Sequence, residues 1–285
     1  MNTNHEDYLH ELMLHARQFA ENRDVYNAAK LYRRIVKLAP DWWEPNAELA
    51  ELYKWQGEWK AMMHYAKRAV ALQAGNPAAW RNLGIAATAL KKDRIAKTVW
   101  QKFGHGADSV DDRSVVALRV PCDKLFEILW ARPLDPASAC LSSIPSPASG
   151  RRFRDVMVFD FTPCGHTVSG RKRYPVFDQL GVLRHSPYHT FSCTVDTTDR
   201  KMLRVLERLC RQAALGFDNW TMAARAMPFH SEISMPEFYG SEVLPASAGT
   251  SLIAIAAKRR SDAEAVIKDW SIITLCGVSD LEQML

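Results

Sequence analysis

A 34-residue pattern occurs three times in the first third of the chain. A shift of 34 positions brings back matching residue types, as at Ala16, Ala50 and Gly84. Small residues at such a position let one helix pack closely on another, and a single hairpin cannot bury its apolar stripe alone. The repeat therefore predicts three helix–turn–helix hairpins stacked into a short solenoid. In the middle copy, the residues spaced as in such a hairpin are Leu49, Ala50, Tyr53, Gly57, Trp59, Ala69 and Leu72.

Two segments carry the match to a known repeat pattern. They are residues 49–59 (LAELYKWQGEW) and residues 80–84 (WRNLG), and Pro40 closes the first copy. On these residues the chain resembles the tetratricopeptide repeat (TPR) family over roughly 9–106. The resemblance implies that the first helices of the hairpins line a concave groove that recognises a peptide or protein. It does not imply catalysis.

The resemblance also assigns residues to that groove. Some family members clamp a partner's terminal carboxylate with lysines and asparagines, but Met13, Arg17, Glu51 and Ile85 stand at those positions here. We therefore expect that clamp to be absent. Trp55 is the candidate aromatic anchor, and the alternative is that it packs against the adjacent repeat. The residues expected to face the groove are Met13, Arg17, Glu51, Lys54, Trp55, Arg81, Ile85 and Thr88.

The composition is that of a globular protein with room for two domains. The chain has 285 residues, of which 47% are hydrophobic and 24% charged. Because the repeat pattern ends near residue 106, we expect a TPR-like helical repeat domain over 1–106 and an α+β domain over 107–285. The expected fold class is thus an α-solenoid followed by a mixed-sheet α+β domain.

The sequence predicts a cytoplasmic location. No run of 18 apolar residues occurs, so a membrane span is not expected, and residues 1–7 do not resemble a secretory signal. The six cysteines lie outside the repeats and form no Cys-x-x-Cys pair. Scattered cysteines of this kind are typical of reduced, buried thiols.

The second domain is expected to alternate strands and helices. Between its first two predicted strands, prolines and serines predict an irregular loop. Runs rich in β-branched and aromatic residues mark the strands. The strands are predicted at 115–120, 156–161, 191–195, 252–257 and 272–275.

Capping residues mark the predicted helices of the second domain. A serine followed three positions later by glutamate forms a capping box, which is a helix-start signal. Gly216 is expected to end the first of these helices. The helices are predicted to begin at Asp196 or Thr197, at Ser261 with Glu264, and at Ser279 with Glu282.

The net charge of +5 comes from the repeats. Residues 1–106 hold 16 Lys and Arg against 11 Asp and Glu, whereas the remainder holds 21 of each. This distribution favours an acidic partner at the repeats. The alternative interpretation is that the basic residues form the solvated faces of the second helices.

Two basic tracts flank one predicted hairpin of the second domain, each beside an aromatic residue, and we expect them to lie close together. Three interpretations remain open. The tracts suit an acidic protein surface, contacts to phosphate or RNA, or solvated strand edges that discourage aggregation. The tract residues are Arg151, Arg152 and Arg154 in the first, and Arg171, Lys172 and Arg173 in the second.

Cysteine and histidine residues offer one route to an enzyme. Cys164, His166, His185 and His189 could supply a cysteine–histidine pair or metal ligands. The alternative is a turn cysteine and surface histidines. The motifs GxGxxG, GxxxxGK[ST], GxSxG and HExxH do not occur.

These features favour a non-enzymatic protein that binds a protein partner, with no cofactor. By analogy with bacterial proteins that join short repeats to an α+β domain, the role would be that of an adaptor, a chaperone or a toxin-neutralising immunity protein. The partner would be an acidic protein or a toxin or effector, bound without a membrane. An enzyme and an RNA-binding protein are the alternatives, and the oligomeric state is left open.

Overall fold

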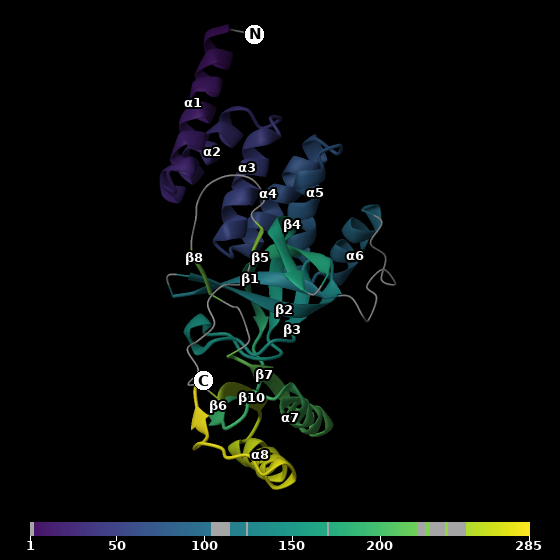
Figure 1. Cartoon of the computed structure of the whole chain (residues 1–285). Helices are drawn as coiled ribbons and strands as arrows, with labels where there is room; N and C mark the ends of the chain where they lie inside the picture. Colours follow the sequence, from purple (N-terminus) through teal and green to yellow (C-terminus); the bar gives the residue numbers. More distant parts are fainter. Residues whose placement is uncertain are drawn as a thin grey trace. The chain divides into compact units, whose positions relative to one another are not determined.

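The computed structural model describes residues 3–103, 115–123, 125–169, 171–221, 226–228, 237–238 and 249–285. The chain divides into two compact units, Met1–Ser109 and Val110–Leu285. Figure 1 shows the helices of the first unit and the strands and helices of the second. The domain boundary expected at 106/107 falls outside the described residues. Among the helices of the described residues, none combines the length and apolarity needed to cross a membrane.

The described part of the first unit consists of three helical hairpins, as the repeat predicts. Each helix packs against the next one along the chain, and α3 also contacts α5. The helices are α1 (Thr3–Glu21), α2 (Val25–Leu38), α3 (Glu44–Trp55), α4 (Trp59–Leu72), α5 (Pro77–Ala89) and α6 (Asp93–Lys102).

The turns inside the three hairpins share one backbone geometry. At the same repeat position φ is positive: 60° at Arg23, 70° at Gly57 and 54° at Lys91. In each turn the next residue donates its N–H to the carbonyl oxygen five positions earlier, at 2.8, 3.0 and 2.8 Å. This is a Schellman-type helix end. The 34-residue repeat is therefore present in the backbone as well as in the sequence.

Close helix packing explains the small residues of the repeat. Ala16 and Ala50 are fully buried. At Gly84, an added Cβ would lie 2.6 Å from two ring atoms of Trp100, which is itself buried. No real Cβ contact is that short, so α5 can approach α6 only with glycine at this position.

A ring of five strands forms the larger sheet of the second unit. β1 pairs antiparallel with β2 and parallel with β5, so the strand order closes on itself. The short strands β8 (Ala226–Pro228) and β9 (Glu237–Phe238) add to β2 and β4. Parallel and antiparallel pairs together confirm the mixed sheet. The ring strands are β1 (Val116–Cys122), β2 (Leu125–Asp135), β3 (Ser138–Leu141), β4 (Val156–Ser169) and β5 (Lys172–Arg184).

Alternate residues of these strands fill the interior of the ring, as in a small barrel. The prediction of an irregular loop after the first strand was wrong for residues 125–141, most of which form β2 and β3. It is confirmed for residues 142–155, which contain only a short 3-10 helix, η2 (Pro147–Ser149). Pro133 lies in β2 opposite Ala139, next to a register shift. Irregular positions of this kind tolerate a proline inside a strand. The buried interior residues are Leu118, Val120, Leu129, Ala131, Ala139, Leu141, Met157 and Phe159.

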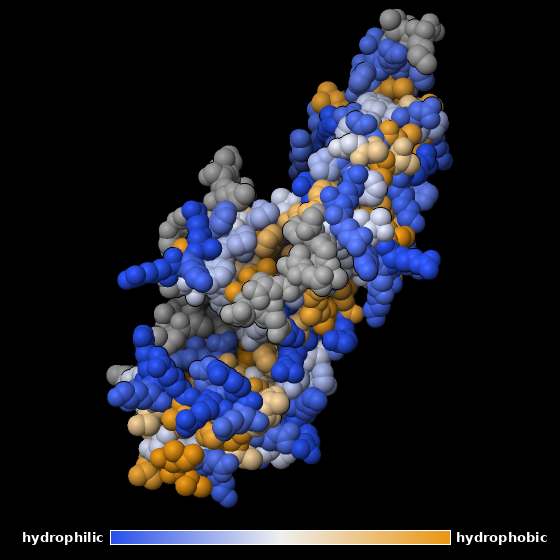
Figure 2. Space-filling model, turned by 90° about the vertical axis from the view of Figure 1, so that its right-hand side faces the viewer, coloured by the Kyte–Doolittle hydropathy of each residue, from blue (hydrophilic) through white to orange (hydrophobic). Residues whose placement is uncertain are grey.

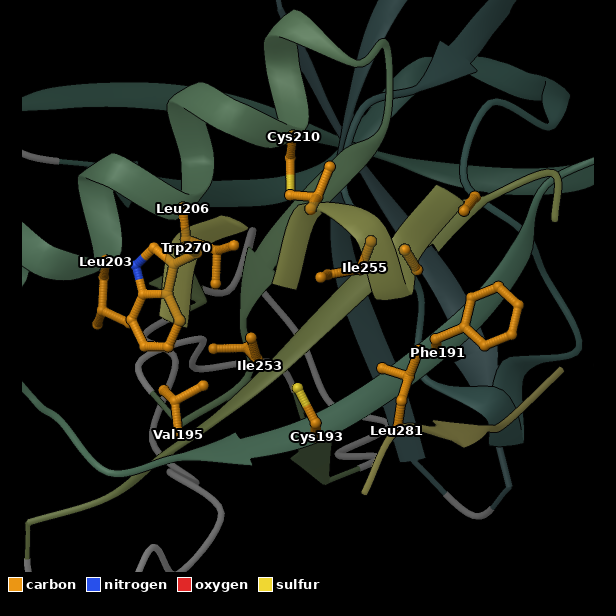
Figure 3. Packing of buried hydrophobic residues seen from close by; sticks show 13 residues of the cluster. Phe191, Cys193, Val195, Leu203, Leu206, Cys210, Ile253, Ile255, Trp270 and Leu281 are labelled. Atoms are coloured by element: carbon orange, nitrogen blue, oxygen red, sulfur yellow. The ribbon is translucent and has the colours of Figure 1, made fainter. Parts of the chain in front are cut away.

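A four-stranded antiparallel sheet with two helices completes the second unit. Its order is β11-β6-β10-β7, and its elements follow one another as β-α-β-β-α-β, the split βαβ arrangement. Alternate residues of β10 face the helices, and the residues between them face Ile144 and Tyr188. Figure 3 shows the buried cluster under the helices. The elements are β6 (His189–Val195), α7 (Arg200–Gln212), β7 (Gly216–Asn219), β10 (Ser251–Ala257), α8 (Arg260–Thr274) and β11 (Glu282–Gln283).

Several predicted helix ends differ from the structure. Asp199 caps α7, because its Oδ1 accepts the Lys201 N–H at 2.8 Å, and Gly216 begins a strand. α8 begins at Arg260, one residue before the predicted serine cap. The terminal segment predicted as a helix forms β11, and Ser279 Oγ accepts the Thr194 N–H there.

The strand predicted at 272–275 is instead the end of α8. β-branched residues predicted a strand, but this preference is weak beside the tertiary packing of a helix. The side chains are exposed: 65% for Ile272, 60% for Ile273 and 91% for Leu275. Figure 2 shows hydrophobic surface at its lower end, the height at which Figure 1 places α8.

Candidate partner-binding surface and basic tracts

Side chains of α1, α3 and α5 meet in the first unit. The Arg17 guanidinium of α1 donates through Nε to Glu48 Oε1 of α3 at 3.3 Å. Asn82 Nδ2 of α5 donates to Glu51 Oε2 of α3 at 3.1 Å. The first helices of the hairpins therefore share one continuous surface, as the resemblance implies. We call it the first-helix surface, defined by Arg17, Glu48, Glu51, Trp55 and Asn82.

Glu51 is the centre of the first-helix surface. Its carboxylate also accepts the indole N–H of Trp55 at 3.0 Å and pairs with the ammonium group of Lys54. Burial disfavours the charged form of Glu51, but the charge of Lys54 and these hydrogen bonds outweigh it, so the pKa of Glu51 lies below its usual range. Glu51 therefore stays ionised at neutral pH.

Glu48, one turn earlier on α3, is in the opposite situation. Burial raises its pKa, and the nearby charge of Arg17 only partly opposes that effect, while the carboxylates of Glu51 and Glu44 add to it. Three carboxylates thus lie along α3 at spacings of four and three residues, which places them on one helix face. Among the described residues, the charge of Glu48 is only partly compensated.

We expect the pKa of Glu48 to lie above that of an ordinary glutamate and the pKa of Glu51 to lie below it. The raised pKa of Glu48 means that its stabilising contribution is present at low pH and is lost as the pH rises through its folded pKa. The lowered pKa of Glu51 means that its contribution is present at neutral pH and is lost as the pH falls through its folded pKa. Carboxyl ¹³C NMR titration of the full chain measures both values.

The two glutamine variants should then act in opposite directions. At pH 7, Glu51→Gln should lower the free energy of unfolding and Glu48→Gln should raise it. Since both side chains are more than a third exposed, each change should stay below about 1 kcal/mol. Identical pKa values for the two carboxyl groups would contradict the described geometry.

Trp55 and Arg81 remain available to a partner, whereas Lys54 does not. Trp55 is 54% exposed, so about half of its surface is open to a partner. Lys54 is buried, with its ammonium group 5.0 Å from the Trp55 ring centroid. Its assignment as a partner-binding residue is therefore corrected to a role inside the chain. Arg81 on α5 is half-buried and has no ion pair with any described residue.

Three other residues expected in the groove belong to the packing. Met13 and Ile85 are buried between helices, and Thr88 Oγ1 accepts the Trp100 indole N–H at 3.3 Å. The sequence reasoning also missed Glu48 and Asn82. These two lie 34 residues apart at the same repeat position, and that spacing is the signal that could have identified them.

The two basic tracts lie at opposite ends of β4, which corrects the expectation that they are close. The first tract precedes β4, and the second begins β5 after the hairpin turn. Fourteen residues of strand separate them, about 45 Å if fully extended. Arg171, Lys172 and Arg173 are exposed there.

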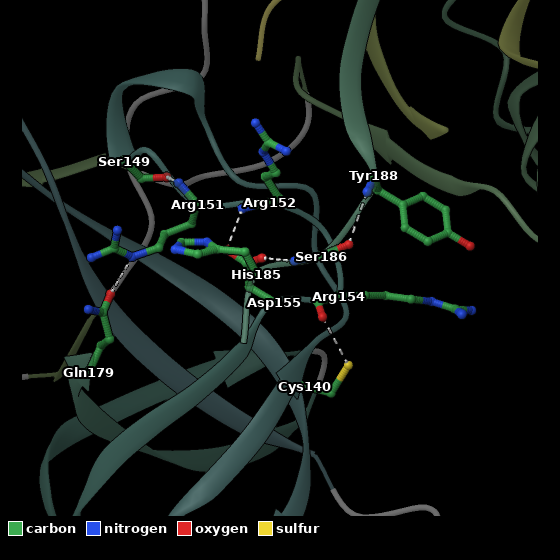
Figure 4. A network of polar contacts seen from close by, with 10 residues as sticks. All are labelled: Cys140, Ser149, Arg151, Arg152, Arg154, Asp155, Gln179, His185, Ser186 and Tyr188. Atoms are coloured by element: carbon green, nitrogen blue, oxygen red, sulfur yellow. Dashed lines mark hydrogen bonds and ion pairs between the residues drawn. The ribbon is translucent and has the colours of Figure 1, made fainter. Parts of the chain in front are cut away.

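The side chains of the first tract diverge. Figure 4 shows Arg151, Arg152 and Arg154 pointing in three directions. Arg151 Nε donates to Gln179 Oε1 at 3.2 Å, whereas the Arg154 guanidinium lies 5.5 Å from the ring centroid of Tyr188. The three arginines therefore do not form a single patch.

The cysteine and histidines proposed as an enzyme site have separate surroundings. Burial, with the nearby carboxylate of Asp178, raises the pKa of Cys164 to about 12, so the thiol is protonated at neutral pH. His185 Nδ1 lies 3.7 Å from Asp155 Oδ2, and the buried Nδ1 atoms of His166 and His189 have no hydrogen-bond partner among the described residues. Within the described residues no group of three His, Cys, Asp or Glu side chains is placed to hold a metal ion.

No family model and no curated protein matches the chain. Solved structures with similar folds include an O-GlcNAc transferase mutant from Thermobaculum terrenum, with 26% identity over 35% of this chain and 19% of that one (TM-score 0.33). Yeast Tom70 shares 21% identity over 37% and 22% (TM-score 0.33). The first TPR of Spaghetti (RPAP3), bound to an HSP90 peptide, shares 19% over 33% and 75% (TM-score 0.32). The chain spans about a fifth of the length of the first two.

The first unit has a TPR-like fold. Its hairpins, their 34-residue period and their common turn geometry define this class of helical repeat. The second unit joins a closed ring of strands to a split βαβ sheet.

Proposed function

We propose that the chain is a protein-binding protein and that the first-helix surface docks a segment of its partner. The observation that carries this proposal is the exposed ring of Trp55 beside the ionised Glu51 and the incompletely compensated Glu48. Aromatic side chains at the edge of a polar network are frequent anchors of protein interfaces. The TPR-like build of the unit adds to this support.

The charges favour a basic partner segment, in contrast to the acidic partner that the net charge of the repeats suggests. Lys or Arg from the partner would compensate Glu48, whose charge Arg17 only partly balances. Arg81 on α5, without an ion pair among the described residues, could receive a carboxylate of the same segment. Ten of the sixteen basic residues of the repeats lie on the second helices α2, α4 and α6 and not on the first helices.

The finer role is also a proposal: an adaptor, a chaperone or a toxin-neutralising protein, acting in the cytoplasm without catalysis. The protonated thiol of Cys164 supports binding over catalysis at that residue. The identity of the partner separates the three roles. An adaptor would bind two proteins that act together, a chaperone would bind a client protein, and a toxin-neutralising protein would bind a toxin.

The test begins with capture of the partner on the immobilised full chain, identification by mass spectrometry, and calorimetry with the purified partner. Trp55→Ala and Glu48→Lys should each weaken binding at least about tenfold. Tyr26→Ala is the matched control, because Tyr26 is an aromatic residue on a second helix and is 72% exposed. Its effect should stay within about twofold. Unchanged affinity in both test variants would refute the proposal.

A further inference from the structure

A basic pocket lies in the second unit, where the ring of strands meets the four-stranded sheet. Its volume is about 710 Å³. β2, β3 and the end of β5 contribute side chains, as do the segments that precede β4 and β6 and the residue that follows β10. The charged and polar residues that line it are Arg132, Arg154, Arg184, Lys258, His185, Ser142 and Ser186, and no carboxylate is among the lining residues.

Four of the lining side chains are arginine or lysine: Arg132, Arg154, Arg184 and Lys258. Arg154, Arg184 and Lys258 form no ion pair with any described residue. The nearest carboxylate, Asp155, is fully buried, and both of its oxygens already accept backbone N–H groups, at 2.7 and 3.0 Å. Asp155 still carries one negative charge near the pocket residue Cys140, but that single charge is fewer than the three cations without an ion pair among the described residues. A bound anion would therefore relieve their remaining mutual repulsion.

Arg154 is held in position before any ligand arrives. Its φ is 66°, a left-handed conformation that is unfavourable for arginine and that tends to occur at functional sites. Its N–H donates to the Leu141 carbonyl at 3.1 Å, and its carbonyl accepts the Cys140 thiol at 3.7 Å. These contacts fix the backbone of Arg154 to β3.

The aromatic ring of Tyr188 makes cation–π contacts with two of the cations. Tyr188 is buried, and its hydroxyl donates to the Ala214 carbonyl at 3.0 Å. The Arg154 guanidinium lies 5.5 Å and the Lys258 ammonium 5.7 Å from the centroid of its ring. Such cation–π contacts hold two like charges near each other without neutralising either. Figure 4 shows Arg154 extending toward the side on which Tyr188 lies.

The positive charges of the pocket also act together on the thiol of Cys140. Burial raises the pKa of the Cys140 thiol, and the charges of Arg132, Arg154 and Arg184 all oppose that rise. Three arginines from different parts of the chain are thus within electrostatic range of one pocket residue. Leu134, Phe153 and Pro187 give the remaining wall an apolar character.

We propose that this pocket binds the phosphate groups of an organic di- or triphosphate of nucleotide size. A single carboxylate would balance only one of the three cations without an ion pair among the described residues, whereas two or three linked phosphates carry enough charge for all three. Arginine also suits phosphate geometry well. The volume lies in the usual range for small-molecule sites. The apolar wall accommodates the organic part. This site is independent of the first-helix surface.

Calorimetry on the full chain at about 150 mM salt tests the proposal, since exposed charges act only over about 8 Å there. The probes are ADP, GDP, inorganic pyrophosphate and adenosine. We expect at least one of the phosphorylated probes to bind with a dissociation constant below about 1 mM and adenosine not to bind. Failure of ADP, GDP and pyrophosphate, or equal binding of adenosine, would overturn it. So would binding of a single-stranded RNA oligonucleotide alone, which would indicate a nucleic-acid surface.

The variant Arg154→Gly with Arg184→Ala should raise the dissociation constant at least about tenfold. Glycine is chosen at position 154 because it favours a positive φ, so the fold should be kept. The matched control is Arg204→Ala with Arg208→Ala, which removes two exposed arginines of α7 in the same unit. An equal loss in both double variants, or no loss in the first, would contradict a specific pocket.

Discussion

Replacing Trp270 by alanine should lower the free energy of unfolding of the second unit by about 3–5 kcal/mol, the usual range for a buried tryptophan. The side chain has no exposed area and lies in the cluster between the helices and the four-stranded sheet, near Leu203 and Leu206 of α7 (Figure 3). Its indole N–H also donates to the Met202 carbonyl at 2.9 Å, which ties α8 to α7. The substitution therefore creates a cavity and breaks a contact between the two helices.

Native-state hydrogen exchange of the β10 amides in the full chain measures this effect. β10 lies between β6 and β7, so its amides exchange only when the sheet opens. Ile272→Ala on the same helix is the control. Ile272 is mostly exposed, so its removal should change the free energy by no more than about 0.5 kcal/mol. A loss below about 1 kcal/mol for Trp270→Ala would show that the cluster is not packed as described.

Asp155→Ala should destabilise the second unit by about 2–5 kcal/mol. Asp155 is fully buried, and its carboxylate accepts the backbone N–H groups of Ser186 and Arg152. Alanine would remove the acceptor of the buried Ser186 N–H and of the partly buried Arg152 N–H. A buried donor without an acceptor costs about 1–3 kcal/mol, and a partly buried one less. The carboxylate therefore holds the segment before β4 against the segment after β5.

Exchange rates of the β4 and β5 amides report this loss directly. The matched control is Asp269→Ala, which removes an exposed carboxylate on α8 and should have an effect within about 0.5 kcal/mol. If the two aspartate variants were equally stable, the network around Asp155 in Figure 4 would not contribute as we infer.

The helical repeats could be predicted from the sequence because their contacts are local. Each hairpin joins residues within 34 positions, so Ala16, Ala50 and Gly84 mark the helix contacts directly. The strands β6 and β10 were also predicted, from local runs of β-branched and other apolar residues. The closure of β1 against β5 could not be predicted, because it pairs Leu118 with Phe177, 59 residues apart, and no local pattern encodes such a register.

The candidate sites likewise divide into residues that the local repeat pattern predicts and residues that only contacts between distant segments bring together. Arg17, Glu51 and Trp55 were identified from their repeat positions, whereas Glu48 and Asn82 required the contacts between helices. The basic pocket could not be predicted from the sequence, which indicates Arg154 only as part of a basic tract. Its cations come from residues as distant as 132 and 258, and only the tertiary structure brings them to one cavity.

Oxidative footprinting of the full chain, free and saturated with its captured partner, tests the central claim most directly. Trp55 and Tyr26 are both exposed aromatic residues of the first unit, but only Trp55 belongs to the first-helix surface. We predict that the partner lowers the oxidation of Trp55 several-fold and leaves that of Tyr26 unchanged. If Trp55 stayed as reactive in the complex as in the free chain, the first-helix surface would not be the binding site.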